Sequence, residues 1–366
     1  MKSSYDIILY FSWTHSSHIH KYLALKDELN KHANTLLIFD NGKFGATQRQ
    51  AKVFEAFWDN VIITDLNQAT QILFNYNPKI LIMGSDKQTL PWQRQVNQQL
   101  KSTTIQLPHL VGVDDYYSGT DFFTVLGPIH EIQSFADRRG KVKNKIHVNP
   151  WLHDLVENCL PYNLTRKQFC EKYKLNENED ILIWLPNMSL VSGCDEGEET
   201  ERETLEIYNK ICSVDNVIVS VHPNEYRRHK SERIGNKWTY ELVSSSRPVL
   251  DPIDCHWAYK YCACGISQVS SIGIEFGFFD KPFVYLGKGS PKHWDKAWAV
   301  DGKSYFSWVG DECPSHKIEE FFAEKLYKIE DKNLYKQHRE KFCVDPNKNF
   351  IKFLAEKILL TDIIKK

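Results

Sequence analysis

The chain has 366 residues, of which 42% are hydrophobic and 25% are charged, and its formal net charge is -1 at pH 7. A chain of this length exceeds what one hydrophobic core normally organises, so we expect two domains. The near-zero charge excludes recognition of nucleic acid by overall electrostatic attraction, and any anion must be bound locally. No apolar run approaches the roughly 20 residues of a membrane-spanning helix.

The first half of the chain alternates short apolar runs with helical patterns. We expect strands at residues 7–11, 35–39, 61–64, 79–83, 103–107 and 122–126, and an amphipathic helix at 20–32. Strands separated by helices in this rhythm are typical of βαβ units, which form a parallel, doubly wound sheet.

The second half begins after a change in character. From Gly140 to Asp180 the sequence becomes charged and helical, and Pro150 and Pro161 interrupt it, so we expect the connection between the domains there. A second alternation follows, with strands expected at 181–185, 217–221, 261–266 and 283–286 and a helix at 199–212. The tail at 349–364 has the spacing of an amphipathic helix that packs back across the other domain.

The architecture expected from these elements is α/β. It comprises a Rossmann-like domain over residues 1–150, a second Rossmann-like domain over residues 151–345, and a C-terminal helix over residues 346–366. Ligands are expected in a cleft between the two domains, at the carboxyl ends of the parallel strands that face it.

Cysteine usage indicates a reducing compartment. All nine cysteines lie at or after Cys159, and they include no paired C-x-x-C set. The opening residues, MKSSYDIILYFSW, have the pattern of a first strand and not of a secretion signal. We therefore expect free thiols in a cytoplasmic protein, with peripheral association at the inner face of the membrane left open, and neither a resident cofactor nor a metal site.

The stretch ISQVSSIGIEFGFFDKPFVYLG, residues 266–287, places two serines and a glycine between a strand and a helix. Ser270 and Ser271 would donate hydroxyl hydrogen bonds to an anion at the helix start, and Gly273 would let a phosphate approach the backbone. The alternative is that a serine only caps the helix, but a capping box needs a glutamate three residues later, and Glu275 is five and four residues after the serines. Glu275 either stabilises the helix dipole or contacts the ligand.

Two further strand ends of the second half carry polar residues. His222 follows the apolar run VIVSV and would contact a phosphate or transfer a proton; the alternative is a surface-loop histidine. Asn187 and Ser189 follow the run ILIWLP and would line the same cleft.

The first half offers two polar loops. His109 lies just past a strand end, with Asp114 and Asp115 nearby, which suits a general base that removes a proton from an acceptor hydroxyl. The alternative is a loop histidine beside solvated acids. A second loop after the first strand carries three polar residues that would either face the cleft or cap the next helix: Ser16, Ser17 and His18.

The order of these motifs resembles GT-B type bacterial transferases that build surface polysaccharides. It is most similar to the CDP-glycerol glycerophosphotransferases of teichoic-acid and capsule synthesis, through ILIWLPNMS, VSVHP and the segment from Leu250 to Gly287. The form SSIGIE...KPFVYLG also resembles capsule and lipopolysaccharide glycosyltransferases. Two departures from the glycerophosphotransferases are the loop at Asn187, which lacks their arginine, and LPHLVG, which stands where they have His-Gly-Thr.

The resemblance implies an acceptor-side first domain and a nucleotide-donor second domain. It implies that His222, Ser270 and Ser271 hold the donor diphosphate and that His109 is the base. The expected function is metal-independent transfer of a glycosyl group from a nucleotide-activated donor to a glycan or lipid-linked acceptor of the cell surface. One alternative is CDP-glycerol-type polyol-phosphate transfer; a second is a nucleotide-sugar 2-epimerase or a non-catalytic nucleotide-sugar-binding protein.

Overall fold

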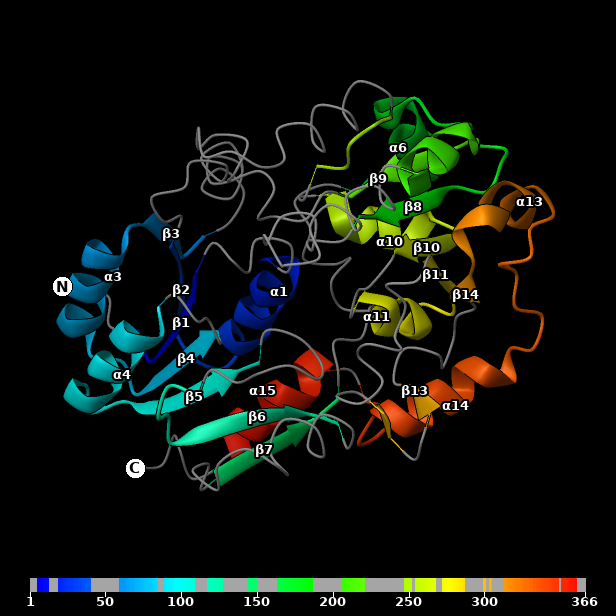
Figure 1. The fold of residues 1–366 in the computed structure, drawn as a ribbon. Coiled ribbons are helices and arrows are strands. Elements are labelled where there is room, and N and C mark those ends of the chain that lie inside the picture. The colour runs from blue at the N-terminus through cyan, green and yellow to red at the C-terminus, as the bar shows by residue number, and fades with distance from the viewer. Residues whose placement is uncertain are drawn as a thin grey trace. The chain divides into compact units, whose positions relative to one another are not determined.

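A computed structural model of the chain (Figure 1) divides into two compact units, Met1–Tyr162 with Glu340–Lys366, and Asn163–Arg339. The structure describes residues 5–12, 19–40, 59–84, 89–108, 117–127, 144–149, 163–186, 206–220, 247–251, 254–267, 272–286, 299–300, 303–304, 312–348 and 350–360. Among these residues, no helix has the length and apolar character needed to cross a bilayer.

The first unit is built on a seven-stranded parallel sheet in the order β3-β2-β1-β4-β5-β6-β7. Its strands are β1 (Ile7–Ser12), β2 (Thr35–Asp40), β3 (Val61–Thr64), β4 (Ile80–Gly84), β5 (Thr103–Leu107), β6 (Phe122–Leu126) and β7 (Asn144–Val148). Its described helices are α1 (Ile19–Asn30), α3 (Leu66–Tyr76), α4 (Leu90–Gln99) and α15 (Phe350–Leu360).

Helices cover both faces of this sheet, as the continuous apolar run of β1 requires. Tyr10 packs its ring against Trp92 of α4, whereas the next residue, Phe11, stacks on Tyr22 of α1. Successive residues of a strand point to opposite faces, so α4 and α1 lie on opposite sides of β1. The C-terminal helix α15 packs against α1 and β7 (Figure 1).

The segment that leads into α15 is held by one buried side chain of the same unit. Asn149, which follows β7 and is fully buried, donates from Nδ2 to the carbonyls of Asp345 and Lys348, at 2.5 Å each. Its Oδ1 accepts from the amide of Asp345 at 2.9 Å. An asparagine bonded in this way satisfies backbone groups of a distant segment as a strand neighbour would.

The second unit is built on a five-stranded parallel sheet in the order β14-β11-β10-β8-β9. Its strands are β8 (Leu182–Leu185), β9 (Val217–Val219), β10 (Cys264–Ser267), β11 (Phe283–Leu286) and β14 (Glu312–Cys313). Helical elements are α6 (Arg166–Tyr173), residues 206–213, α10 (Cys255–Tyr261), α11 (Ile272–Phe278), the 3-10 turn Ser315–Lys317, α13 (Ile318–Ala323) and α14 (Asn333–Phe342). A separate antiparallel pair joins β12 (Ala299–Val300) and β13 (Lys303–Ser304).

The α/β prediction with two parallel sheets is confirmed, and two local predictions are wrong. The stretch expected to be a helical connection contains β7, an edge strand with exposed Asn144 and Lys145. Polar residues are usual on edge strands and conceal the apolar pattern. Tyr261, expected in a strand, is the last residue of α10, because the Cys262 amide still bonds the Ala258 carbonyl at 2.8 Å.

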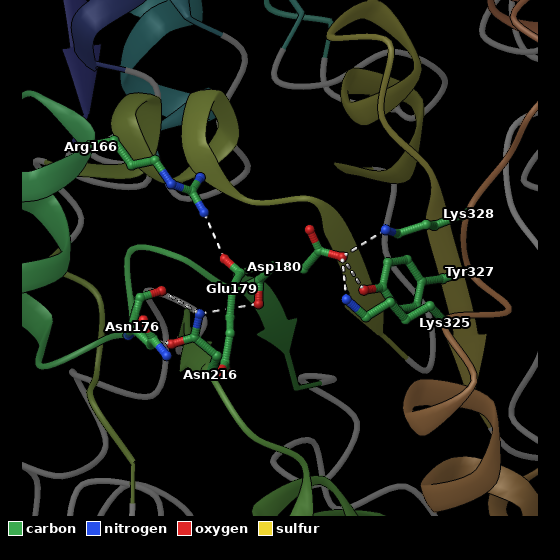
Figure 2. A network of polar contacts seen from close by, with 8 residues as sticks. All are labelled: Arg166, Asn176, Glu179, Asp180, Asn216, Lys325, Tyr327 and Lys328. Carbon is green, nitrogen blue, oxygen red and sulfur yellow. Dashed lines mark hydrogen bonds and ion pairs between the residues drawn. The ribbon is translucent and has the colours of Figure 1, made fainter.

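A polar network ties together the amino-terminal edge of the second sheet (Figure 2). Asp180, two residues before β8, accepts from the Tyr327 hydroxyl at 2.8 Å and pairs with two lysines, Lys328 at 3.1 Å and Lys325 at 3.5 Å. Beside it, Asn216 donates from Nδ2 to the Asp180 carbonyl at 3.1 Å. Ligands of such sheets bind at the opposite, carboxyl edge, so this network serves the fold.

Replacing the Asp180 carboxylate should cost stability in a pH-dependent way. Burial raises the pKa of Asp180, but the tyrosine hydroxyl and the two ammonium groups outweigh it and hold the pKa below its usual value. A depressed carboxyl pKa stabilises the folded state above the unfolded pKa, and this contribution is lost as the pH falls. We expect Asp180→Asn to lower the free energy of unfolding by about 1 kcal/mol at pH 7.

Urea unfolding at pH 7 and pH 3 measures this difference. The difference in the free energy of unfolding between the wild type and Asp180→Asn should be smaller at pH 3 than at pH 7. The matched control is Glu171→Gln, an exposed acid of α6. An Asp180→Asn variant as stable as the wild type at pH 7 would contradict the prediction.

Candidate functional site

The strand order of the second sheet identifies where a ligand would bind. The chain runs from β8 outward to β9 and then returns to the other side of β8 to form β10. After β8 the chain moves to one side of the sheet and after β10 to the other, so the carboxyl ends of β8 and β10 form a topological switch point. Open α/β sheets bind ligands at such topological switch points.

The two strand ends at this switch point are joined by a serine. Ser267, the last residue of β10, pairs in register with Leu185, the last residue of β8. Its Oγ donates to the Leu185 carbonyl at 2.6 Å, and the side chain is fully buried. The bond fixes the relative position of the two ends from which the flanking loops leave. Ser267 was not among the site residues predicted from the sequence, although it is the first polar residue after the apolar run.

Most residues singled out from the sequence lie outside the described residues, so their roles stay predictions. In the second unit these are Asn187 and Ser189, which follow β8, His222, which follows β9, and Ser270 and Ser271, which follow β10. In the first unit they are Ser16, Ser17, His18, His109, Asp114 and Asp115. Gly273 and Glu275 are described, and both lie on α11.

Gly273 allows α11 to pack closely on β11. A Cβ at this position would lie 2.3 Å from the Tyr285 hydroxyl and 2.9 Å from the Phe283 ring. Contacts this short are incompatible with any side chain unless the helix moves away from the strand. Packing therefore requires the glycine whether or not a phosphate approaches it.

Glu275 is a buried residue of the first turn of α11, with 6% of its surface exposed. Burial raises the pKa of Tyr259 on α10 well above its usual value, and the charges of Cys255 and Glu275 raise it further. The carboxyl group of Glu275 thus lies within electrostatic reach of α10. A buried carboxylate must be held by polar contacts, so Glu275 is more than a solvated acid at a helix start.

Lys281, two residues before β11, ties the end of α10 to the start of β11 at the amino edge of the second sheet, opposite to the switch-point edge. Its partly buried ammonium donates to the carbonyls of Lys260, at 2.5 Å, and Cys262, at the carboxyl end of α10. A cation at this end of a helix satisfies terminal carbonyls and opposes the helix dipole. Burial lowers the pKa of Lys281 to about 8, with a further decrease from Arg166 and an opposing effect of Cys262.

Because of Lys281, the free energy of unfolding should rise with pH above neutral pH. The folded-state pKa is about 8 and the unfolded value 10.5, so between these pH values the unfolded chain binds more protons and stability rises with pH. We expect the free energy of unfolding of the wild type to rise relative to Lys281→Met by up to about 3 kcal/mol over this interval.

Chemical unfolding at pH 7.5, 8.5 and 9.5 tests the profile, where comparison with the variant cancels the contribution of other groups. Lys332→Met, at an exposed position, is the matched control. A difference between wild type and Lys281→Met that stays constant over this range would refute the assignment.

The first sheet has its own switch point, between β1 and β4. Next to it, three polar residues end adjacent strands in register: Ser12 of β1, Asp40 of β2 and Thr64 of β3. All three are buried, and the Asp40 carboxylate accepts from the Tyr10 hydroxyl at 3.0 Å. Residues paired across parallel strands lie on one face, so this row is a second polar strand-end group that the sequence analysis missed.

At the end of β4, the other side of this switch point, a glutamine fixes the backbone. Gln93 of α4 is fully buried and donates from Nε2 to the Gly84 carbonyl at 2.8 Å and to the Thr89 hydroxyl at 3.1 Å. In both units, therefore, a buried polar side chain holds the carbonyl that ends a switch-point strand. Among the described residues, no group of three or more acidic, histidine or cysteine side chains is placed to hold a metal ion.

Solved structures with a similar fold cover nearly the whole chain. The wall teichoic acid polymerase TagF matches 98% of this chain and 90% of its own, with a TM-score of 0.59 and 11% identity. A UDP-GlcNAc 2-epimerase from Methanocaldococcus jannaschii, in complex with UDP-GlcNAc and UDP, matches 96% and 98%, with a TM-score of 0.58 and 12% identity. The Neisseria meningitidis UDP-GlcNAc 2-epimerase bound to UDP-GlcNAc matches 98% and 100%, with a TM-score of 0.56 and 13% identity.

What this chain shares with these proteins is the fold. No protein-family model matches the sequence, and no curated protein sequence matches it. The GT-B fold implied by the sequence motifs is confirmed by structures that are 11 to 13% identical to this chain. The predicted architecture was therefore recognisable from a few strand-end motifs in a sequence that otherwise diverges.

Proposed function

We propose that this protein is an enzyme that binds a nucleotide-activated donor at the β8–β10 switch point and transfers its glycosyl group to an acceptor of the cell-surface glycan. The observation that carries the proposal is the bond from Ser267 to the Leu185 carbonyl at this switch point. It fixes the ends of the two strands whose following loops contain Asn187 and Ser189 on one side and Ser270 and Ser271 on the other.

The chemistry follows from the residue types in these loops. His109, assisted by Asp114 or Asp115, removes the proton from the acceptor hydroxyl as its oxygen attacks the anomeric carbon. The bond from that carbon to the donor phosphate breaks, and the nucleotide diphosphate leaves with the electron pair. His222, Ser270 and Ser271 stabilise the charge that develops on the phosphate, so the step uses no metal ion.

The similar structures support a nucleotide diphosphate as the donor. The epimerases of Methanocaldococcus jannaschii and Neisseria meningitidis hold UDP-GlcNAc, and TagF has been studied with CDPG. The acceptor we propose is a glycan, free or lipid-linked, which would bring the protein to the membrane surface. Polyol-phosphate transfer is the second candidate, favoured by the likeness to TagF, and 2-epimerisation or nucleotide-sugar binding alone is the third, favoured by the likeness to the epimerases.

Nucleotide binding is the first measurement. A ligand that binds only the folded state stabilises it, by about 2.7 kcal/mol at a concentration of 100 times its dissociation constant. We expect one of CDP, CMP, UDP and GDP to raise the melting temperature by several degrees. The double variant Ser270→Ala and Ser271→Ala should lose this shift, whereas Ser213→Ala, at an exposed serine of the same unit, should keep it. A protein stabilised by none of the four nucleotides would rule out the proposal.

Turnover separates the three candidates. Stabilisation by CDP alone favours polyol-phosphate transfer, and stabilisation by UDP or GDP favours a sugar donor. A C2 epimer that forms from UDP-GlcNAc without any acceptor identifies an epimerase.

The variant His109→Ala tests the assignment of His109 as the general base. We expect His109→Ala to lower the transfer rate by about 10²- to 10⁴-fold and to keep its nucleotide affinity, because a general base acts on the acceptor and not on the donor. Transfer at the wild-type rate in this variant would eliminate His109 as the base.

A further inference from the structure

Helix α11, which carries Glu275 and follows the Ser270-Ser271 loop, is intrinsically weak. It has seven residues, IGIEFGF, two of which are glycines. Each glycine inside a helix costs about 1 kcal/mol relative to alanine, and isolated helices shorter than about 12 residues are marginal in water. The conformation of α11 is therefore maintained by the elements packed around it.

One of these elements is α14, two side chains of which contact the backbone of α11. His338 Nε2 lies 2.9 Å from the carbonyl of Ile274, in the first turn of α11, and its ring lies 4.9 Å from that of Phe278. The next residue, Arg339, donates to the Phe278 carbonyl at 3.2 Å and to the Asp280 carboxylate at 2.6 Å. Consecutive residues of α14 thus hold the beginning and the end of α11.

The protonation states of His338 and Arg339 favour stable contacts with α11 at neutral pH. His338 has 1% of its surface exposed, and burial lowers its pKa to about 4, with a smaller decrease from Arg339 and increases from the Ile274 bond and Asp280. The imidazole is therefore neutral at neutral pH, and its Nε2–H donates to the carbonyl, which can only accept. Arg339 satisfies a terminal carbonyl of α11 and opposes the helix dipole.

We infer that His338 and Arg339 are positioning residues for the donor site: they hold α11, and with it Glu275, in the donor-binding arrangement. This inference rests on the proposed function, because it assigns α11 to the donor site. Neither residue touches the donor. Without the contacts from His338 and Arg339, α11 does not keep its helical conformation. Donor binding therefore weakens, while the chemical step on bound donor continues.

Hydrogen exchange of the backbone amides of residues 272–280 tests whether His338 and Arg339 stabilise α11, and the measurement needs no ligand. We expect His338→Phe, which keeps an aromatic ring but removes the hydrogen bond, to speed exchange of this segment about tenfold and to leave β4 unchanged. His338→Gln, which can donate to the same carbonyl, should recover most of the protection. Arg339→Gln, at a partly exposed position, should speed exchange of the last residues of the segment about threefold. Gln337→Ala, an exposed neighbour on α14, is the control and should match the wild type.

Titration of the same proteins with CDP, CMP, UDP and GDP tests the connection with the donor site. The nucleotide that binds the wild type should bind His338→Phe about five- to tenfold more weakly, with a matching increase in KM and little change in kcat, and His338→Gln should restore it. Wild-type exchange of 272–280 in His338→Phe would overturn the positioning role. So would faster exchange with unchanged nucleotide affinity. A wild type that binds none of the four nucleotides would instead refute the proposed function, and the exchange rates would still decide whether His338 holds α11.

Discussion

The hydrogen bond from Ser267 to the carbonyl of Leu185 fixes the geometry on which the second unit depends. In a parallel sheet the ladder bonds end where the strands end, and the carbonyls beyond them need other partners. At the β8–β10 switch point a buried hydroxyl provides such a partner at 2.6 Å. The loops that leave these strands therefore start from fixed points, although their own sequences are free to vary with the ligand.

The contrast between the two edges of this sheet follows from the same constraint. At the amino edge, Asp180, Asn216 and Arg166 bond mostly to backbone carbonyls and to tyrosine and lysine side chains, in a network that is fully accounted for by the fold. Lys281, two residues before β11, adds a further contact at this amino edge by donating to the carbonyls of Lys260 and Cys262. At the carboxyl edge, Ser267 joins the ends of β10 and β8, and the buried Glu275 lies in the first turn of α11. The polar groups of the amino edge thus serve the stability of the fold, whereas under the proposed function those of the carboxyl edge serve ligand binding.

How far the sequence could predict this structure depended on the kind of signal. Periodicity located most strands of the two parallel sheets, because buried parallel strands such as β1 and β4 are continuous apolar runs. It did not detect the two-residue strands β12, β13 and β14. It failed for β7, whose polar edge residues hide the run, and at Tyr261, where one apolar run spans the end of a helix and the start of a strand. Motif resemblance predicted the fold, and the donor loops that it also indicates lie outside the described residues and stay predictions. It could not find His338, because a histidine in a charged helix gives no local sign of the carbonyl that it will meet 64 residues away.

The division of the chain also has a consequence for biosynthesis. The second unit is one continuous segment, whereas the first unit needs its last helix, α15, to cover α1 and β7. A chain emerging from the ribosome can complete residues 163–339 while the surface that awaits α15 is still exposed on the first unit. The N-terminal strands are thus synthesised first, but their unit is completed last. The hydrogen bonds of Asn149 to Asp345 and Lys348 form only when residues 345–348 have been made. During that interval the second unit can be folded while the first unit still exposes the apolar surface that α15 will cover.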